Sequence, residues 1–251
     1  MGSEMALIEL ESLRFSYHKT SEKYRQMILD GISLSIERNE TVGVIGHNGA
    51  GKSTLLKLLV GIESTYTGTA RVFGRTISRE NLKEIRKKIG YVFQDSDSQL
   101  FMTTVYGDVA FAPENYGFSQ EEVKKRTQDA LKKVHMEQMA EKRIYQLSGG
   151  EKKLTAIATV LPMQPEIILL DEPSVALDPK NRRNLIHVLN EIQTTKIIAS
   201  HDLDFIYDTC KRTILLDEGK VVADGETQTL LQDKELLVAH GLELPLSFSR
   251  R

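Results

Sequence analysis

The sequence predicts an α/β protein whose sheet is largely parallel, and three observations lead to this class. Short apolar stretches typical of strands alternate with longer amphipathic stretches typical of helices, an order that favours parallel strands. The glycine-rich stretch GHNGAGKST, residues 46–54, joins a strand-like to a helix-like stretch. Near residue 170, a short apolar run ends in two carboxylates. With 251 residues, 40% of them hydrophobic, the chain suffices for one compact domain with a lobe or for two small domains.

The first half of the chain changes from strand-like to helical patterns. Residues 6–45 contain the strand-like stretches ALIEL, LRFSY, ISLSI and TVGVI. The stretch TLLKLLVGI follows the glycine-rich loop, and its apolar spacing predicts a helix face of Leu55, Leu58, Leu59 and Ile62. Residues from about 100 to 146 are rich in Glu, Lys, Gln and Met, and SQEEVKKRTQDALKKVHM has the period of an amphipathic helix. We therefore expect a mostly helical lobe in the middle.

Strand and helix patterns alternate again from residue 166 onward. EIILLD predicts a short buried strand, and TKIIASH predicts another. Between them, DPKNRRNLIHVLNEI predicts a helix with Asp178 as its cap and Pro179 at its first position. RTILLDEGKVVADG predicts a hairpin that turns near residues 218–219.

Composition excludes several classes of protein. Lys and Arg total 33 against 35 Asp and Glu, so the chain lacks the overall positive field that attracts nucleic acid. Cys210 is the single cysteine, which excludes an intramolecular disulfide and a cysteine zinc cluster and favours a reducing compartment. No apolar run exceeds four residues, whereas a membrane helix needs about twenty. We expect neither a membrane span nor a signal peptide.

The loop at residues 46–53 matches the phosphate-binding pattern G-x-x-x-x-G-K-[ST] in full. Glycines let backbone N–H groups approach phosphate oxygens, and the following helix N-terminus favours an anion. Lys52 would reach the β- and γ-phosphates, and the Ser53 hydroxyl would bind Mg²⁺. The predicted nucleotide-binding residues are Tyr17, Gly46, His47, Asn48, Gly49, Ala50, Gly51, Lys52, Ser53 and Thr54.

A P-loop needs an acidic group near its metal ion, and the strand-like run at residues 167–170 supplies one. Asp171 would hold Mg²⁺, directly or through water, and Glu172 would polarise the attacking water. An apolar run that ends in Asp is weak support alone, because many core strands look the same. Together with the P-loop it predicts an ATP and Mg²⁺ site.

The stretch YQLSGGE, residues 145–151, permits two interpretations. Ser148 and Glu151 fit a capping box at the start of a helix whose apolar face is Leu154, Ile157, Ala158 and Leu161. Gly149 and Gly150 at a helix start would also form an anion-binding nest. A second phosphate site this far along the chain from the first is unusual.

At this point the sequence resembles ATP-binding cassette (ABC) ATPases over about residues 7–225. Their signature LSGGQ appears here as LSGGE, and Val175-Ala176 departs from the commoner small pair of the D-loop. The other motifs occur in the family's order: an aromatic residue that stacks on adenine, a Q-loop glutamine, a D-loop aspartate and a switch histidine. The aromatic residue is Tyr17, with Tyr24 as the less favoured choice, and the Q-loop glutamine is Gln94. The D-loop aspartate is Asp178, and the switch histidine is His201.

The resemblance implies a P-loop NTPase fold with a RecA-like parallel sheet core, an N-terminal antiparallel β subdomain and a helical lobe. It places the ATPase domain at residues 5–225, the lobe at about 97–160 and a short tail at 226–251. It implies two subunits that face head to tail, so that Ser148, Gly149, Gly150 and Glu151 act on ATP held by the partner. Lys52, Gln94, Glu172 and His201 would be catalytic, and Ser53, Gln94 and Asp171 would hold Mg²⁺. The other histidines, His18, His47, His135, His187 and His240, are interpreted as incidental.

The stretch FQDSDSQLFMTTVYGDVAFAPENYG is similar to ATPases of energy-coupling factor (ECF) importers. In those importers the region after the Q-loop contacts a membrane T component, which implies contacts by Gln99, Leu100 and Phe101. Ordinary packing of the helical lobe is the alternative for each of them. The resemblance further implies a substrate-binding membrane component and a location at the cytoplasmic face of the membrane.

The stretch ELLVAHGLELPLSFSRR resembles the short tail of cobalt- or nickel-type members. We therefore favour a homodimer and a transition-metal cargo over a heterodimer and a vitamin cargo. Another ABC importer remains an alternative, and a soluble ABC protein of DNA repair or translation is a remote one. A P-loop kinase or GTPase would explain Lys52 but not LSGGE, Gln94 or His201.

Overall fold

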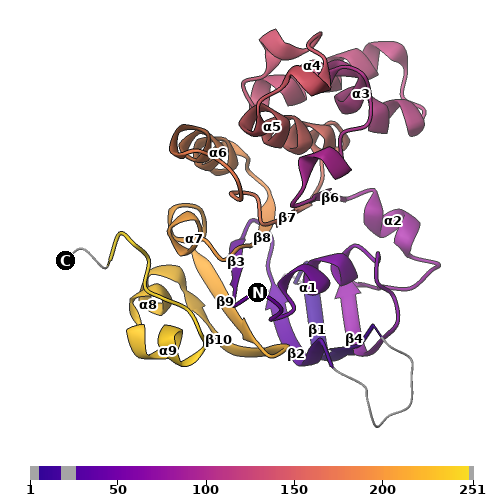
Figure 1. Cartoon of the computed structure of the whole chain (residues 1–251). Coiled ribbons are helices and arrows are strands. Elements are labelled where there is room, and N and C mark those ends of the chain that lie inside the picture. Colours follow the sequence, from indigo (N-terminus) through magenta and orange to yellow (C-terminus); the bar gives the residue numbers. More distant parts are fainter. Residues whose placement is uncertain (1–5, 18–26, 249–251) are drawn as a thin grey trace, which may run out of the picture. The chain divides into compact units, whose positions relative to one another are not determined.

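The computed structural model describes residues 6–17 and 27–248. It divides into two compact units, residues 1–86 with 195–251 and residues 87–194. Figure 1 labels the elements of both. Each unit is described by itself. The predicted alternative Tyr24 lies outside the described residues.

The first unit contains an antiparallel sheet built on β1 (Ile8–Phe15). Its other strands are β2 (Leu29–Ile36), β4 (Tyr66–Val72) and β5 (Arg75–Thr76), in the order β2-β1-β4-β5. The pairing of β1 shifts register after Leu10, where Ser12 adopts a positive φ of 49° and its N–H donates to the Ser33 hydroxyl at 2.8 Å. This irregularity bends the strand.

Parallel strands form the second sheet region of this unit. The central strand β3 (Thr41–Ile45) pairs with β8 (Thr195–Ala199) on one side and β9 (Arg212–Asp217) on the other, both in parallel. β10 (Lys220–Glu226) pairs antiparallel with β9 through a turn at Glu218 and Gly219, both with positive φ, which confirms the predicted hairpin. The helices are α1 (Lys52–Leu59), α2 (Leu82–Arg86), α7 (Leu203–Thr209), α8 (Thr227–Gln232) and α9 (Lys234–Ala239).

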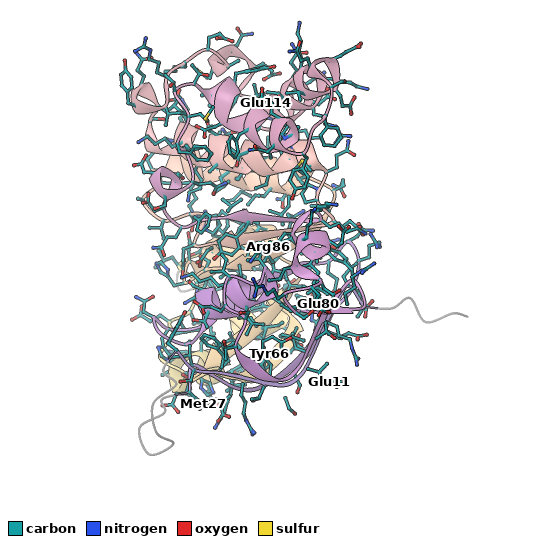
Figure 2. All side chains as sticks on the ribbon, turned by 90° about the vertical axis from the view of Figure 1, so that its right-hand side faces the viewer. Glu11, Met27, Tyr66, Glu80, Arg86 and Glu114 are labelled. Atoms are coloured by element: carbon teal, nitrogen blue, oxygen red, sulfur yellow. The ribbon has the colours of Figure 1, made fainter. Side chains whose placement is uncertain are left out.

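The predicted helix after the glycine-rich loop is shorter than its apolar pattern indicated. Gly61 adopts φ 70°, and Ile62 N–H donates to Lys57 O at 2.9 Å, which ends α1 in a left-handed cap. Ile62 is 47% exposed, so its placement on the buried face was wrong. Arg86, labelled in Figure 2, donates to the carbonyls of Val60 and Gly61 at 3.0 and 2.7 Å.

The second unit contains a parallel pair of short buried strands, β6 (Ile89–Val92) and β7 (Ile167–Asp171). Its α-helices are α3 (Val105–Asn115), α4 (Gln120–Lys133), α5 (Gly149–Val160) and α6 (Pro179–Glu191). The 3-10 turns are η2 (Ser96–Ser98), η3 (Glu137–Met139), η4 (Ile144–Gln146) and η5 (Leu161–Met163). The predicted apolar face of α5 is buried. Among all described helices, none has the length and apolar character to span a bilayer.

Candidate functional site

The glycine-rich loop connects β3 to α1, and its conformation depends on glycine. Gly46 and Gly51 adopt φ of 149° and 104°. A Cβ at Gly46 would lie 2.2 Å from the Leu216 carbonyl oxygen, and a Cβ at Gly51 would lie 2.9 Å from Ile28 O. The loop is therefore packed so closely on its neighbours that these positions exclude a side chain. It ends at the N-terminus of α1, where backbone N–H groups favour an anion.

The Lys52 ammonium lies against this loop. Its Nζ donates to the carbonyls of Gly46 at 2.8 Å and His47 at 3.2 Å, and the residue is only 6% exposed. These contacts hold the positive charge against the loop backbone. A phosphate bound there would compete for the same ammonium with a charged and therefore stronger acceptor.

Tyr17 is anchored next to α1 with one ring surface open. Its hydroxyl shares a hydrogen bond with the Thr54 hydroxyl at 3.1 Å, and its ring meets Phe15 edge to face at 4.9 Å. The side chain remains 49% exposed. A fixed, half-exposed ring is suited to stacking on a flat base.

His47 takes part in a contact that sequence reasoning missed. Its Nε2 lies 2.9 Å from Asp217 Oδ1 at the end of β9, and His240 Nδ1, after α9, lies 2.7 Å from Asp217 Oδ2. The hydrogen bond from His240 is the main cause that holds the pKa of Asp217 below its usual value. The glycine-rich loop is thus connected through Asp217 to His240 after α9, and both histidines have a structural contact.

His201 lies at the same sheet edge as the loop. It follows β8, whose next residue Ser200 donates its N–H to Val44 O of β3 at 3.1 Å. Parallel strands bring their carboxyl ends to one edge, so the residues after β3 and after β8 are neighbours. Asp202 caps α7 by accepting from Phe205 N–H at 2.9 Å, which fixes the turn that carries the exposed His201.

In the second unit, the predicted carboxylates end the buried strand β7. Asp171 and Glu172 are 5% and 6% exposed, and the Tyr91 hydroxyl donates to Asp171 Oδ2 at 3.2 Å. Glu172 adopts φ 45°, a left-handed conformation that is unfavourable for a residue with a side chain. Such strain is concentrated at functional sites in proteins.

Gln94 follows β6 in the same unit, and a buried lysine holds its backbone. Lys153 of α5 donates from Nζ to the carbonyls of Gln94 at 2.7 Å and Phe93 at 3.2 Å. Burial lowers the pKa of Lys153 to about 8, against the opposing attraction of Asp95 and Asp171. Sequence reasoning missed this residue, because a lysine beside the apolar face of a helix usually extends to solvent.

The glycine-rich start of α5 contains the predicted capping box. Ser148 accepts from Glu151 N–H at 3.3 Å, and Glu151 accepts from Ser148 N–H at 2.7 Å, which lowers the pKa of Glu151. Gly149 has open space around it, whereas a Cβ on Gly150 would meet Asn181 of α6 at 2.3 Å. The capping interpretation is confirmed, and Gly149 stays accessible.

Asp178 caps the next helix as predicted. It accepts from the N–H groups of Asn181 at 3.0 Å and Lys180 at 2.8 Å, and these bonds lower its pKa. Asn181 therefore contacts both the cap of α6 and the start of α5. Asn181 thus links Asp178 to Gly150 at the start of α5 within the second unit.

Comparison with known proteins connects these features. The family described as ABC transporter matches residues 29–175, more than half of the chain. The chain belongs to the ABC transporter ATP-binding family. This ABC ATPase is 42% identical, over 95% of its length and 87% of the relative, to the energy-coupling factor transporter ATP-binding protein EcfA of Carboxydothermus hydrogenoformans. It is 41% identical, over 95% and 77%, to EcfA of Methanothermobacter thermautotrophicus.

Solved structures agree with this assignment. CbiO1 from Clostridium perfringens, part of the ABC transporter complex cbiONQ, matches with a TM-score of 0.84 and 34% identity over 94% of each chain. The ATP-binding cassette MJ0796, solved as a dimer bound to ADP and Pi, matches with 0.77 and 28% over 88% of this ABC ATPase and 98% of the other. The predicted ABC ATPase fold, the resemblance to ECF-type ATPases and the ATPase activity are thereby confirmed.

The predicted site residues of this ABC ATPase fall into two groups. The first unit brings together Tyr17, the loop from Gly46 to Thr54 and His201. The second unit carries Gln94, Asp171 and Glu172, and on α5 and α6 the residues Ser148, Gly149, Gly150, Glu151 and Asp178. Each group contains positioning contacts that the motifs alone do not reveal.

Proposed function

We propose that this ATPase is the motor subunit of an ECF-type importer and that Glu172 activates the water that attacks ATP. The observation that carries the assignment is a glycine-dependent phosphate loop in the same chain as a carboxylate pair that ends a buried strand. Lys52 and the loop residues bind the phosphates, Tyr17 stacks on adenine, and His201 contacts the γ-phosphate. Residues 5–225 form the ATPase domain with a lobe at about 97–160, and residues 226–251 form the tail.

The donor set suits Mg²⁺. The Ser53 hydroxyl, the Gln94 amide oxygen and the Asp171 carboxylate are oxygen ligands, which Mg²⁺ prefers. When bound, the ion would neutralise charge on the β- and γ-phosphates. The Tyr91 hydroxyl orients Asp171 for this role, and Lys153 fixes the backbone of Gln94.

The signature residues act on the nucleotide of a second ATPase subunit. Dimeric cassettes among the similar structures support this arrangement. Gly149 is open, and Ser148 stands at the N-terminus of α5, where N–H groups can receive a phosphate. We favour a homodimer, with a heterodimer as the alternative.

Exposed aromatic side chains after the Q-loop form the proposed contact with the membrane T component. Phe101 is 64% exposed and meets Phe111 edge to face at 4.7 Å. Asp108 accepts from the N–H groups of Phe101 and Met102, both at 3.1 Å, and so fixes this loop. Gln99 instead bonds to Ala156 O at 2.8 Å inside the unit, and Leu100 is buried. We therefore assign the contact to Phe101 and its exposed neighbours, rather than to Gln99 or Leu100.

The proposed cargo is a transition-metal ion, cobalt or nickel, taken up with the help of a substrate-binding membrane component. The resemblance of residues 235–251 to cobalt- and nickel-type members supports it, as does the likeness to CbiO1. The ATPase would then bind peripherally at the cytoplasmic face of the membrane. A vitamin cargo is the alternative, and purification of the complex from membranes with identification of its subunits distinguishes the two.

The test of the catalytic assignment is Glu172→Gln, with Glu121→Gln on the exposed surface of α4 as the matched control. The first variant should bind ATP, accumulate dimers on size exclusion and hydrolyse ATP about 10²–10⁴-fold more slowly. The control should resemble the wild type. Turnover of Glu172→Gln within a few-fold of wild type would remove Glu172 from this role.

A further inference from the structure

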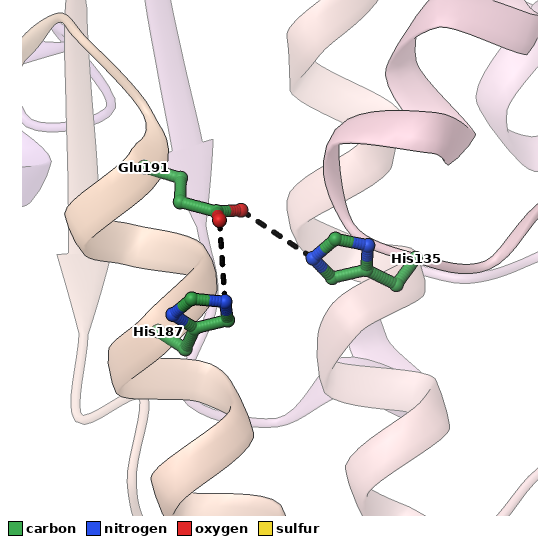
Figure 3. Close-up of side chains that lie close together, drawn as sticks. All are labelled: His135, His187 and Glu191. Atoms are coloured by element: carbon green, nitrogen blue, oxygen red, sulfur yellow. Dashed lines mark ion pairs between the residues drawn. The ribbon is translucent and has the colours of Figure 1, made fainter.

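Two histidines and a glutamate gather on the surface of the second unit, and none of the three is among the site residues assigned above. His187 and Glu191 lie one turn apart on α6, and His135 follows the end of α4 (Figure 3). His187 Nε2 lies 3.2 Å from Glu191 Oε1, and His135 Nε2 lies 3.4 Å from Glu191 Oε2. One ligand atom from each residue lies within 4.8 Å of the others.

The spacing of these atoms suits ion pairs and also suits the ligands of one metal ion. N–H···O hydrogen bonds are usually about 2.7–3.2 Å long. Ligands at about 2.0–2.1 Å from a tetrahedral ion lie roughly 3.3 Å apart. The two nitrogen–oxygen distances, 3.2 Å to Glu191 Oε1 and 3.4 Å to Glu191 Oε2, are close to that edge length. The imidazole rings are stacked 12° from parallel, with centroids 6.1 Å apart.

The backbone at His135 is held in an unusual conformation that points to a role for its side chain. His135 adopts φ 57° at the position after the α4 cap, where glycine is the usual residue. Its N–H donates to Lys132 O at 3.1 Å, and Met136 N–H donates to Leu131 O at 2.9 Å. A histidine here costs more than a glycine would, yet it presents an imidazole to α6.

The residues on either side of His135 fix the position of its backbone. Val134 and Met136 are 0% and 3% exposed, so the backbone on both sides of His135 is anchored in the core. His187 and Glu191 share a regular helix, where residues four apart face the same way. Surface His–Glu pairs contribute little stability on their own, so ion pairing alone gives no reason for this arrangement.

We propose that His135, His187 and Glu191 form a binding site for a divalent transition-metal ion that clips the end of α4 to α6. Two imidazoles and one carboxylate suit Zn²⁺, Co²⁺ or Ni²⁺, whereas Mg²⁺ and Ca²⁺ prefer oxygen ligands. The exposed position leaves a fourth ligand place for water. Lys133, which lines a pocket together with Glu191, has a stem long enough to keep its ammonium in solvent.

Occupancy would stabilise helix α6, which begins at Pro179 after its cap Asp178 and contacts Gly150 through Asn181. The site is independent of the proposed cargo, because a metal on the cytoplasmic ATPase is not the transported ion in its membrane component. The proposed metal site therefore does not depend on the importer assignment.

The experiment titrates untagged, nucleotide-free protein with Zn²⁺ by calorimetry and with Co²⁺ by visible absorption. The wild type should bind one equivalent of metal ion and show a tetrahedral Co²⁺ spectrum. His135→Gln, His187→Gln and Glu191→Gln should each lower the metal affinity at least 10-fold and lack this spectrum. The Tm of the wild type should rise with metal concentration, and that rise should vanish in the variants. Glu121→Gln, with its glutamate on α4 outside the cluster, should behave as the wild type.

Two outcomes would overturn the proposal. One is a wild-type protein without a stoichiometric transition-metal site. The other is histidine variants that fold, as judged by circular dichroism, and bind Zn²⁺ as tightly as the wild type. Magnesium-dependent ATP hydrolysis should be unchanged in all three variants without added transition metal, which separates this site from the catalytic one.

Discussion

Replacing Lys153 by methionine should change how stability depends on pH. The substitution keeps most of the side-chain volume and removes the ammonium of a residue that is only 3% exposed. In the wild type this group donates to Phe93 O and Gln94 O. Burial lowers its pKa from 10.5 to about 8. At pH values between about 8 and 10.5, Lys153 is therefore protonated in the unfolded chain and deprotonated in the folded chain.

The sign and size of the effect follow from that difference. Stability rises with pH wherever the unfolded state binds more protons, so the wild type should gain stability between pH 8 and 10.5 relative to Lys153→Met. One pKa unit corresponds to about 1.4 kcal/mol, which gives a gain of about 2 kcal/mol between about pH 7 and 9.5. At pH 7, relief of the buried charge in the variant is offset by the loss of the hydrogen bonds to Phe93 O and Gln94 O, since bonds from a charged donor contribute about 1.5–3 kcal/mol each.

The assay is urea unfolding followed by circular dichroism at several pH values in this range. Lys152→Met is the control, because Lys152 pairs with Asp97 at the surface at 2.6 Å, and it should show no comparable trend. Steady-state ATP hydrolysis gives a second readout, since the backbone of Gln94 loses its anchor in Lys153→Met and kcat should fall. A stability difference from wild type that is flat with pH would show that Lys153 is not desolvated, and the reasoning would fail.

Two further predictions concern the glycine-rich loop. Gly46→Ala should lose nucleotide binding and about 2 kcal/mol or more of stability, because its Cβ would clash with Leu216 O; titration with a fluorescent ATP analogue and a melting curve test this, and wild-type affinity would contradict it. The pKa of Asp217 is lower in the folded chain than its ordinary value of 3.8, so its carboxylate stabilises the fold at pH values above 3.8. This stabilisation is lost as the pH falls through the folded pKa, and Asp217→Asn should remove it. Acid unfolding from pH 6 to 2.5 should therefore show two curves that converge at low pH, and parallel curves would exclude the carboxylate as the cause.

Features that depend on neighbours in sequence could be predicted from the sequence. The glycines of the phosphate loop, the box of Ser148 with Glu151, and Asp178 before Pro179 are each set by backbone geometry within a few residues. The end of α1 is an informative exception. The left-handed Gly61 overrode an apolar pattern that continued to Ile62.

Contacts between distant segments could not be predicted. His47 and Asp217 meet although they are 170 residues apart in the chain, and Asp217 also contacts His240. Lys153 and Gln94 meet although they are 59 residues apart. A single sequence contains no signal for such pairs, because a histidine or a lysine at these positions fits a solvated surface equally well. His135 and His187 were interpreted as incidental for the same reason.

The segment between β7 and α6 shows why some positions tolerate strain. It begins at Asp171, whose buried carboxylate accepts from Tyr91, and it ends at Asp178, which caps α6. Between them Glu172 and Ala176 adopt φ of 45° and 62°, a backbone conformation that costs less conformational free energy for glycine. A glycine at residue 172 would relieve the strain but remove the carboxylate on which the proposed chemistry depends. The two fixed ends, Asp171 bonded to Tyr91 and Asp178 bonded to the first N–H groups of α6, together hold Glu172 in this conformation.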